Sequence, residues 1–235
     1  MVEPRSSMSG FVPALRFHAL TPCYDTIVAL TTRETAYRQQ LLKGIEAARP
    51  SRLLDLGCGT GSLAIMAAAR HPDWTVIGVD ADPAILTIAA RKARRAGATV
   101  EFVNARAQDP GLVNATVDVV VSSLLFHHLD DAGKHAAFAQ CLRLLRPGGE
   151  MHLLDWGEPQ DVLMSVTILP VRILDGFANT RANVRGALAG MMAAAGFSDV
   201  RTVFRLRTPL GSLALIKGVR PATAGETGRT GDANS

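Results

Sequence analysis

The sequence predicts an α/β domain in which helices cover both faces of a mostly parallel sheet. Three observations predict it. Short apolar runs alternate with helical segments between residues 32 and 155. The first of these runs leads into a glycine-rich turn and then a helix, and two further strands end the ordered part of the chain. Strands joined by helices of this length pair in parallel through right-handed crossovers.

The predicted elements follow one another at short intervals. The first helix runs from Thr32 to about Ala48, and Pro50 ends it. Apolar runs predict strands at Leu53–Leu56, Thr75–Val79, Val100–Val103, Val117–Ser122 and Glu150–Asp155. The helices between them are predicted at Ser62–Arg70, Pro83–Ala96 and Ala132–Leu145. Pro83 suits the first turn of its helix, and Gly97 suits the end of that helix.

The last part of the chain predicts one more helix and a strand pair. The helix covers Asn183–Ala195 and is closed by Gly196, and Val200–Leu206 and Ser212–Lys217 form the two strands. Residues from Pro221 onward are small, polar and rich in glycine, which is typical of a disordered tail. We therefore divide the chain into an N-terminal segment with cap helices (1–49), one main domain (50–220) and a disordered tail (221–235).

Composition narrows the class of protein. With 48% hydrophobic residues among 235, the chain can build a core, which excludes disorder of the whole chain. A net charge of +4 with 5% aromatic residues is weak support for a nucleic-acid partner, and none is predicted. Three cysteines without a paired spacing argue against a disulfide framework or a zinc site. We expect a cytoplasmic protein, since no apolar run is long enough to span a membrane.

The glycine-rich turn is the strongest chemical signal. Asp55 lies near the end of the first predicted strand, and Gly57, Gly59 and Gly61 follow before the helix begins. Glycine permits positive φ angles and lets a ligand lie against bare main chain, so the turn is typical of a nucleotide site. The alternative is a tight strand-to-helix turn without a ligand.

The next strand supports the nucleotide site. Asp80 ends that strand, where the carboxylate of a doubly wound sheet meets an adenosine ribose. Asp82 comes just before Pro83 and suits a helix cap, which leaves Asp80 for a ligand. The dinucleotide fingerprint needs its third glycine one residue after Gly61, where Ser62 stands, so an NAD(P)-dependent oxidoreductase is the weaker alternative.

Four motifs then resemble one family. DLGCGTG, VIGVDADP, VDVVVSSLLFHHL and LRLLRPGGEMHLLDWGEP are similar to the Rossmann-like (class I) S-adenosylmethionine-dependent methyltransferases, and to the ubiquinone/menaquinone C-methyltransferase-like group among them. The resemblance covers roughly residues 20–218. It implies a three-layer α-β-α sandwich with a seven-stranded, mostly parallel sheet whose last strand is antiparallel, and S-adenosyl-L-methionine as the cofactor.

The resemblance also implies the cofactor-binding residues. The glycine turn packs against the methionine part, and Asp55 fixes the turn and helps to hold the ammonium group. Asp80 binds the ribose, and Ala81 flanks the adenine. Arg38 pairs with the cofactor carboxylate, unless it is a surface arginine. The implied set is Asp55, Gly57, Cys58, Gly59, Thr60, Gly61, Asp80, Ala81, Arg106, Ala107, Ser123 and Arg38.

One pair departs from the family pattern. Where the family has an acid or amide followed by alanine, this chain has Arg106-Ala107. Arginine only donates hydrogen bonds, so it cannot accept from the adenine amino group; it either stacks on the ring or lies in solvent. Asp109 is an alternative acceptor, and the backbone N–H of Ala107 is expected to reach a ring nitrogen.

The candidate catalytic residues are two histidines and one tyrosine. Methyl transfer is an in-line displacement that needs alignment, and it needs a base only when the acceptor must lose a proton. His127 and His128 follow the fourth strand and are the candidate bases, with a structural role as the alternative. Tyr24 is placed near the methyl group by the resemblance. No metal site is predicted, because the two adjacent histidines lack a recognisable third ligand.

Residues 156–182 complete the prediction. This segment is largely apolar and is expected to shape an acceptor pocket, the alternatives being a packing segment or a contact in a homodimer. We therefore predict methyl transfer to a small, partly apolar molecule. The alternative from another class is a non-catalytic methyltransferase-like subunit of a larger assembly. Arsenic methylation is disfavoured, because three spread cysteines cannot easily hold a soft centre.

Overall fold

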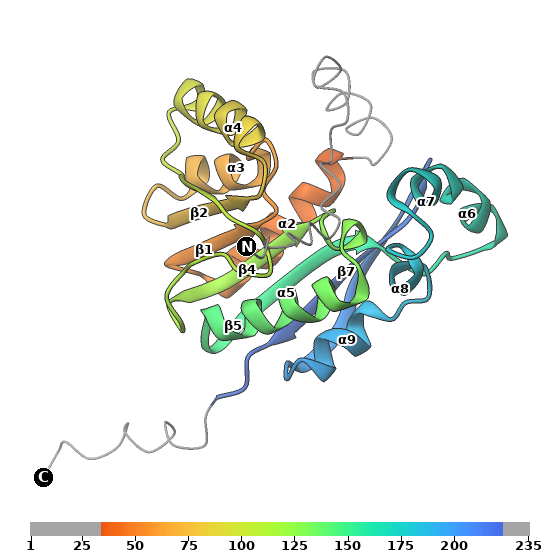
Figure 1. Ribbon diagram of the computed structural model, residues 1–235. Coiled ribbons are helices and arrows are strands. Elements are labelled where there is room, and N and C mark those ends of the chain that lie inside the picture. Colours follow the sequence, from red (N-terminus) through yellow and green to blue (C-terminus); the bar gives the residue numbers. More distant parts are fainter. Residues whose placement is uncertain (1–33, 223–235) are drawn as a thin grey trace, which may run out of the picture.

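A seven-stranded sheet with the order β3-β2-β1-β4-β5-β7-β6 forms the centre of the computed structural model, which describes residues 34–222 (Figure 1). Strands β1 to β5 pair in parallel, while β7 runs antiparallel to both β5 and β6. The predicted mostly parallel sheet with its last strand antiparallel is confirmed. The strands are β1 (Arg52–Leu56), β2 (Thr75–Asp80), β3 (Glu101–Asn104), β4 (Val117–Ser123), β5 (Leu145–Trp156), β6 (Ser198–Thr208) and β7 (Gly211–Val219).

Helices cover both faces of this sheet, so the predicted sandwich of three layers is confirmed. Side chains of α2 and α3 pack into one buried cluster, and side chains of α5 and α9 pack into the cluster on the opposite face. The helices are α2 (Glu34–Ala48), α3 (Ser62–Arg70), α4 (Pro83–Ala96), η2 (Phe126–His128), α5 (Asp131–Leu144), α6 (Val162–Thr167), α7 (Leu169–Asp175), α8 (Arg181–Val184) and α9 (Leu188–Ala194).

The alternation along β1 shows how the sequence divides between the two faces. Leu54 and Leu56 belong to the cluster under α5 and α9, whereas Leu53 belongs to the cluster under α2 and α3. Successive side chains of a strand point to opposite faces, so Asp55 shares the face of Leu53. A carboxylate is thereby placed in the buried layer directly before the glycine turn.

Two predicted elements differ in extent. The helix predicted at Asn183–Ala195 is two helices, because Gly186 has a φ of +67° and interrupts it between α8 and α9. Strand β5 begins before the predicted Glu150, since Leu145 already pairs with Val117 of β4. In the same segment Gly148 and Gly149 exchange hydrogen bonds with the main chain of residue 220, so the sequence expected to end a helix joins the sheet.

The division of the chain into 1–49, 50–220 and 221–235 stays a prediction. Helix α2 shares its buried cluster with α3, β1 and β4, so residues 34–49 pack as part of the main core. Tyr24 and most of the predicted tail lie outside the described residues. Between residues 34 and 222, no helix has the length and apolarity that a membrane span requires.

Candidate functional site

The turn between β1 and α3 is shaped by its three glycines. Gly57, Gly59 and Gly61 have φ angles of +76°, +52° and +74°, in the region that other residues rarely adopt. The N–H groups of Gly57 and Cys58 donate to the carbonyl of Val79 at 2.8 and 3.0 Å, which fixes the turn against the end of β2. A Cβ atom on Gly59 would meet nothing within 4 Å, so the main chain there is open to a ligand.

Asp80, the last residue of β2, joins this turn to the start of α4. Its two oxygens accept hydrogen bonds from the N–H groups of Gly59, at 2.9 Å, and of Asp82, at 3.0 Å. Each carboxylate oxygen can accept a second bond, so the half-buried Asp80 keeps capacity for ribose hydroxyls. Asp82 caps α4 through the N–H of Ala84 at 2.8 Å, so its predicted role as the helix cap is confirmed, and the ribose role of Asp80 stays a prediction.

Asp55 lies at the buried end of β1. It is 1% exposed, and its Oδ1 atom has no hydrogen-bond partner among residues 34–222. Burial raises the pKa of Asp55 to about 7, although the positive charge of Arg38 and the N–H of Ala64 act in the opposite direction. A buried carboxylate oxygen without a partner is rare in a folded protein and fits a bound cationic group.

The remaining side chains of the turn are held from α4. The Nζ atom of Lys92 donates to the hydroxyl groups of Thr60, at 2.9 Å, and Ser62, at 2.7 Å. Burial raises the pKa of the Cys58 thiol, as do the nearby charges of Asp55 and Asp80, so this thiol stays protonated. Sequence reasoning missed Lys92, because a lysine in a basic run on a helix is usually solvated.

The ends of β3 and β4 border the same turn. The N–H of Ala105 donates to the carbonyl of Asp80 at 3.1 Å, which places Arg106 and Ala107 beside the end of β2. Ala107 is buried, whereas the predicted Arg106 is exposed and forms an isolated bridge with Asp109. The cofactor roles predicted for Arg106, Ala107 and Ala81 stay predictions.

At the end of β4 the two serines differ. Ser122 donates its hydroxyl to the carbonyl of Leu56 at 2.8 Å, which ties β4 to β1, while the predicted Ser123 is half buried at the tip of the strand. Leu125 follows and leaves room for glycine only, since a Cβ atom on Gly57 would lie 2.8 Å from its side chain. The close approach of β4 to the turn therefore requires Gly57.

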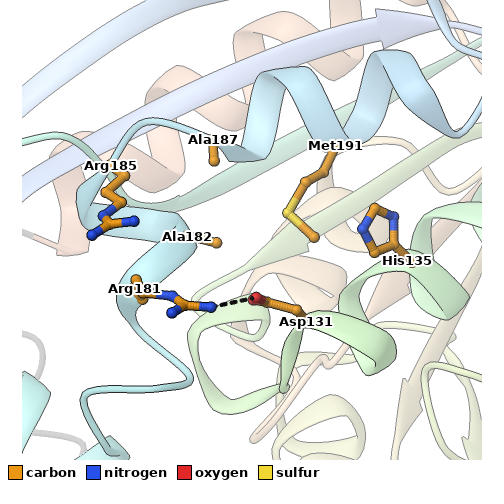
Figure 2. Close-up of a pocket in the computed structure, with 7 residues that line it drawn as sticks. All are labelled: Asp131, His135, Arg181, Ala182, Arg185, Ala187 and Met191. Carbon is orange, nitrogen blue, oxygen red and sulfur yellow. Dashed lines mark hydrogen bonds and ion pairs between the residues drawn. The ribbon is translucent and has the colours of Figure 1, made fainter.

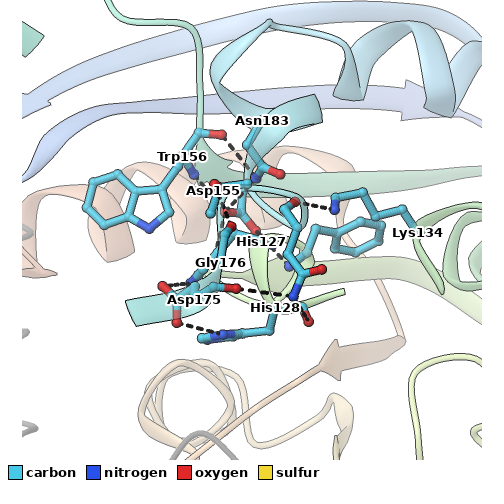
Figure 3. A network of polar contacts seen from close by, with 11 residues as sticks. His127, His128, Lys134, Asp155, Trp156, Asp175, Gly176 and Asn183 are labelled. Carbon is cyan, nitrogen blue, oxygen red and sulfur yellow. Dashed lines mark hydrogen bonds and ion pairs between the residues drawn. The ribbon is translucent and has the colours of Figure 1, made fainter. Parts of the chain in front are cut away.

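His127 is buried within η2, which follows β4 and contacts the end of β5. Its Nδ1 atom is 2.8 Å from Oδ1 of Asp155, which lies near the end of β5 (Figure 3). Asp155 also accepts hydrogen bonds from the main chain of Trp156, at 2.7 Å, and from the side chain of Asn183, at 3.1 Å. Burial lowers the pKa of His127, but the charge and hydrogen bond of Asp155 outweigh it and hold this pKa above its ordinary value.

Asp175, at the end of α7, faces both histidines. Its oxygens lie 3.2 Å from Nδ1 of His128 and 3.7 Å from Nε2 of His127. Burial and the charge of His127 lower the pKa of His128. Burial raises the pKa of Asp175, but the hydrogen bond from His128 and the charges of both histidines hold it below its ordinary value. The sequence offered no third potential ligand atom beside the histidines, and the fold brings the carboxylate of Asp175 to this edge.

The rest of the segment 156–182 divides into two sides. Met164, Ile168 and Val171 are buried against the sheet, whereas other apolar side chains of α6 and α7 face outward. The exposed set is Val162, Leu163, Val166, Leu169, Ile173 and Leu174, and Phe177, just after α7, is exposed as well. Arg172 lies over the ring of Phe177, with its guanidinium carbon 4.5 Å from the ring centroid. Exposed apolar side chains therefore flank Asp175 in the chain, and the acceptor pocket predicted for this segment stays a prediction.

A separate hollow of about 380 Å³ lies between α5, α8 and α9 (Figure 2). In it Arg181 forms an ion pair with Asp131 at 3.4 Å, and His135, Arg185 and Met191 line the remainder. Of the predicted site residues that the structure describes, none lines this hollow. We therefore place the candidate site at the carboxyl ends of β1, β2, β4 and β5, where ligands of parallel sheets bind.

The sequence is similar to known methyltransferases. Residues 53–149 match the family model described as a methyltransferase domain. The chain is 30% identical over 217 residues to nocamycin O-methyltransferase of Saccharothrix syringae, an alignment that covers 82% of this chain and 76% of the relative. It is also 32% identical over 145 residues to demethylmenaquinone methyltransferase of Thermus thermophilus, covering 61% of this chain. The chain spans 65% of the length of that relative.

A solved structure shares the fold. The S-adenosylmethionine-dependent methyltransferase SibL, crystallised in its apo form, superposes with a TM-score of 0.66 at 20% identity. The superposition covers 89% of this chain and 60% of SibL.

Proposed function

Because this chain belongs to the class I S-adenosylmethionine-dependent methyltransferases, we propose that it transfers a methyl group to a small, partly apolar molecule. The predicted family, and S-adenosylmethionine as the cofactor that goes with it, are confirmed. The observation that carries the proposal is the buried Asp55, whose Oδ1 lacks a partner among the described residues, beside the open main chain at Gly59. The NAD(P)-dependent and non-catalytic alternatives gain no support from the relatives.

The residues at this edge fit the cofactor. Asp55 would hold the ammonium of the methionine part, since a buried carboxylate needs a positive partner. The open main chain at Gly59 would receive the cofactor, and Asp80 would bind the ribose hydroxyls with its remaining acceptor capacity. Arg38, whose charge already acts on Asp55, would pair with the cofactor carboxylate.

When bound, S-adenosylmethionine supplies a methyl group on a positively charged sulfur, ready for in-line displacement. The chain then has to align the acceptor with that methyl group and to exclude water. Leu125 packs on Gly57 and leads into His127, so one short segment connects the cofactor turn to the histidines. We propose that His127 and His128 act on the acceptor rather than on the cofactor.

The acceptor class follows from the surface beside the histidines. Exposed apolar side chains of α6 and α7, Leu174 at 82% exposure among them, suit an apolar molecule better than a charged polymer. The Thermus and Saccharothrix relatives are named for small molecules, demethylmenaquinone and nocamycin. The absence of a nucleic-acid partner, the cytoplasmic location and the homodimer stay predictions.

An activity assay tests the proposal. The full chain is incubated with S-adenosylmethionine and a panel of small aromatic and aliphatic alcohols, phenols, quinols and amines, and S-adenosylhomocysteine is measured by chromatography. We expect S-adenosylhomocysteine to form only when an apolar acceptor is present. Cofactor binding without turnover across the panel would favour the non-catalytic alternative instead.

A further inference from the structure

Three electron-pair donors from distant parts of the chain converge beside the end of β4. Among the described residues, His127, His128 and Asp175 each offer a ligand atom, and these atoms all lie within 4.8 Å of one another. Asp175 is 3.7 Å from His127 and 3.2 Å from His128. Ligands of a tetrahedral zinc ion are separated by roughly 3.3 Å, given metal–ligand bonds of about 2.0 Å. The spacing therefore approaches that of a metal site.

Asp155 prepares one of these donors. Because Nδ1 of His127 lies 2.8 Å from Asp155, the proton of a neutral imidazole is held on Nδ1 and the lone pair on Nε2 faces Asp175. Hydrogen bonds from Trp156 and Asn183 hold Asp155 in turn (Figure 3). A carboxylate that orients a histidine in this way is the usual second layer of a metal centre. Asp155 is thus a positioning residue.

The charges around the cluster favour a cation. Two carboxylates, those of Asp155 and Asp175, act on His127. Among the described residues, the positive charge that also acts on it is the buried Lys134. The Nζ atom of Lys134 is engaged by two main-chain acceptors, since it donates to the carbonyls of Leu129 and of Asn179. Either a second proton on Nε2 or a bound cation balances the charge of the Asp175 oxygen that faces this nitrogen.

We propose that His127, His128 and Asp175 bind a divalent transition-metal ion, of which Zn²⁺ is the model, and that this ion activates a hydroxyl group of the acceptor. Two imidazoles and one carboxylate favour Zn²⁺, Co²⁺ or Fe²⁺ over Mg²⁺, which prefers oxygen. Three protein ligands leave a coordination position for the acceptor oxygen. Metal binding stands on this geometry alone, whereas the catalytic part rests on the proposed function.

The proposed methyl transfer needs only the acceptor, the cofactor and water. A metal-bound hydroxyl group loses its proton to water, because the metal lowers the pKa of the bound oxygen. The resulting oxygen then forms the new carbon–oxygen bond, while the bond between carbon and sulfur breaks and the sulfur keeps that electron pair. No oxidant, reductant or separate base is needed. The site therefore predicts a hydroxylated acceptor, methylated on oxygen.

Metal binding is tested on the full chain without a histidine tag, after treatment with a chelator and its removal. Co²⁺ is titrated and its visible absorption is recorded, and Zn²⁺ is then added as a competitor. We expect one equivalent of Co²⁺ to bind with the absorption of a nitrogen-containing site, and Zn²⁺ to remove it. Asp175→Asn and His128→Gln should each weaken Zn²⁺ binding by more than about tenfold.

The matched control is His135→Ala, because this exposed histidine on α5 lies outside the cluster. Its Zn²⁺ affinity should equal that of the unchanged chain. Calorimetry with S-adenosylmethionine on every variant shows that the fold is intact and tests the proposed function separately. The inference is overturned if Co²⁺ does not bind while S-adenosylmethionine does, or if all variants bind Zn²⁺ equally.

Discussion

The two halves of the candidate site are built in different ways. The cofactor half, at the ends of β1 and β2, is held by main-chain contacts such as those of Gly57 and Cys58 with Val79. The acceptor half, around His127, is held by side chains that come from β5, α7 and α8. Main-chain geometry is dictated by a short local motif, whereas a side-chain network needs the whole fold. The first half therefore depends mainly on short sequence motifs, and the second on contacts between segments far apart in the chain.

Removing Asp155 should have the largest effect and confirm that the acceptor half depends on a buried network. Asp155→Ala removes the shared acceptor of the His127 ring, the Asn183 side chain and three main-chain N–H groups. We expect the free energy of unfolding to fall by about 3–5 kcal/mol, as for a broken buried ion pair. Urea unfolding followed by circular dichroism measures it. The exposed Asp199→Asn is the control, and a loss no larger than that of the control would show that the network is dispensable.

Removing Asp80 should affect the cofactor half of the site, because Asp80 is proposed to bind the ribose. Asp80→Ala is expected to weaken S-adenosylmethionine binding more than about tenfold, since a charged hydrogen bond is worth roughly 1.5–3 kcal/mol. Calorimetry measures the dissociation constant, with the exposed Asp73→Ala as the control. If Asp80→Ala leaves the dissociation constant unchanged, the ribose does not bind at the end of β2.

The affinity for S-adenosylmethionine should depend on pH through Asp55. The pKa of Asp55 is about 7 because of burial, and the ammonium of the cofactor needs the ionised carboxylate. Affinity should therefore rise by up to about tenfold per unit as the pH increases toward this pKa, and level off above it. The folded protein holds a proton on Asp55 that the unfolded chain releases, so this group lowers stability as the pH rises from about 4 to about 7.

Calorimetry across this pH range checks the prediction, and Asp55→Asn is the comparison that isolates the protein group. The variant should bind more weakly and lose the part of the pH dependence that the carboxylate contributes, while titration of the ligand itself remains. Identical pH profiles for both proteins would mean that Asp55 does not meet the ammonium.

Replacing Lys92 should have the smallest effect on cofactor binding, because this side chain on α4 contacts hydroxyl groups at the end of the turn. Lys92→Met removes the hydrogen bonds to Thr60 and Ser62 and should weaken cofactor binding about twofold to tenfold. The exposed Arg95→Met, on the same helix, should leave binding unchanged. Equal effects of the two variants in the same titration would show that only the net charge of α4 matters.

Sequence reasoning reached the first half almost completely. The positive φ angles of Gly57, Gly59 and Gly61, the strand end at Asp80 and the cap at Asp82 all follow from local rules about glycine, strands and helix starts. The sheet and its antiparallel last strand were predictable because alternating strands and helices leave few topologies. These features depend on residues close together in the chain.

The second half was beyond the same rules. His127 and His128 were identifiable, but Asp175 meets them only because α6 and α7 return to the sheet, and no local pattern encodes that contact. The helix break at Gly186, which separates Asn183 from the rest of the predicted helix, was missed for a related reason. A glycine within a helical pattern is tolerated or breaks the helix according to its tertiary contacts.

A parallel calorimetric titration asks whether the edge beside Asp55 and Asp80 is a site for S-adenosylmethionine. The purified chain is titrated with S-adenosylmethionine, S-adenosylhomocysteine and NADH under identical conditions. This site assignment predicts micromolar binding of both sulfur compounds and no binding of NADH. Binding of NADH alone, or of none of the three, would contradict it.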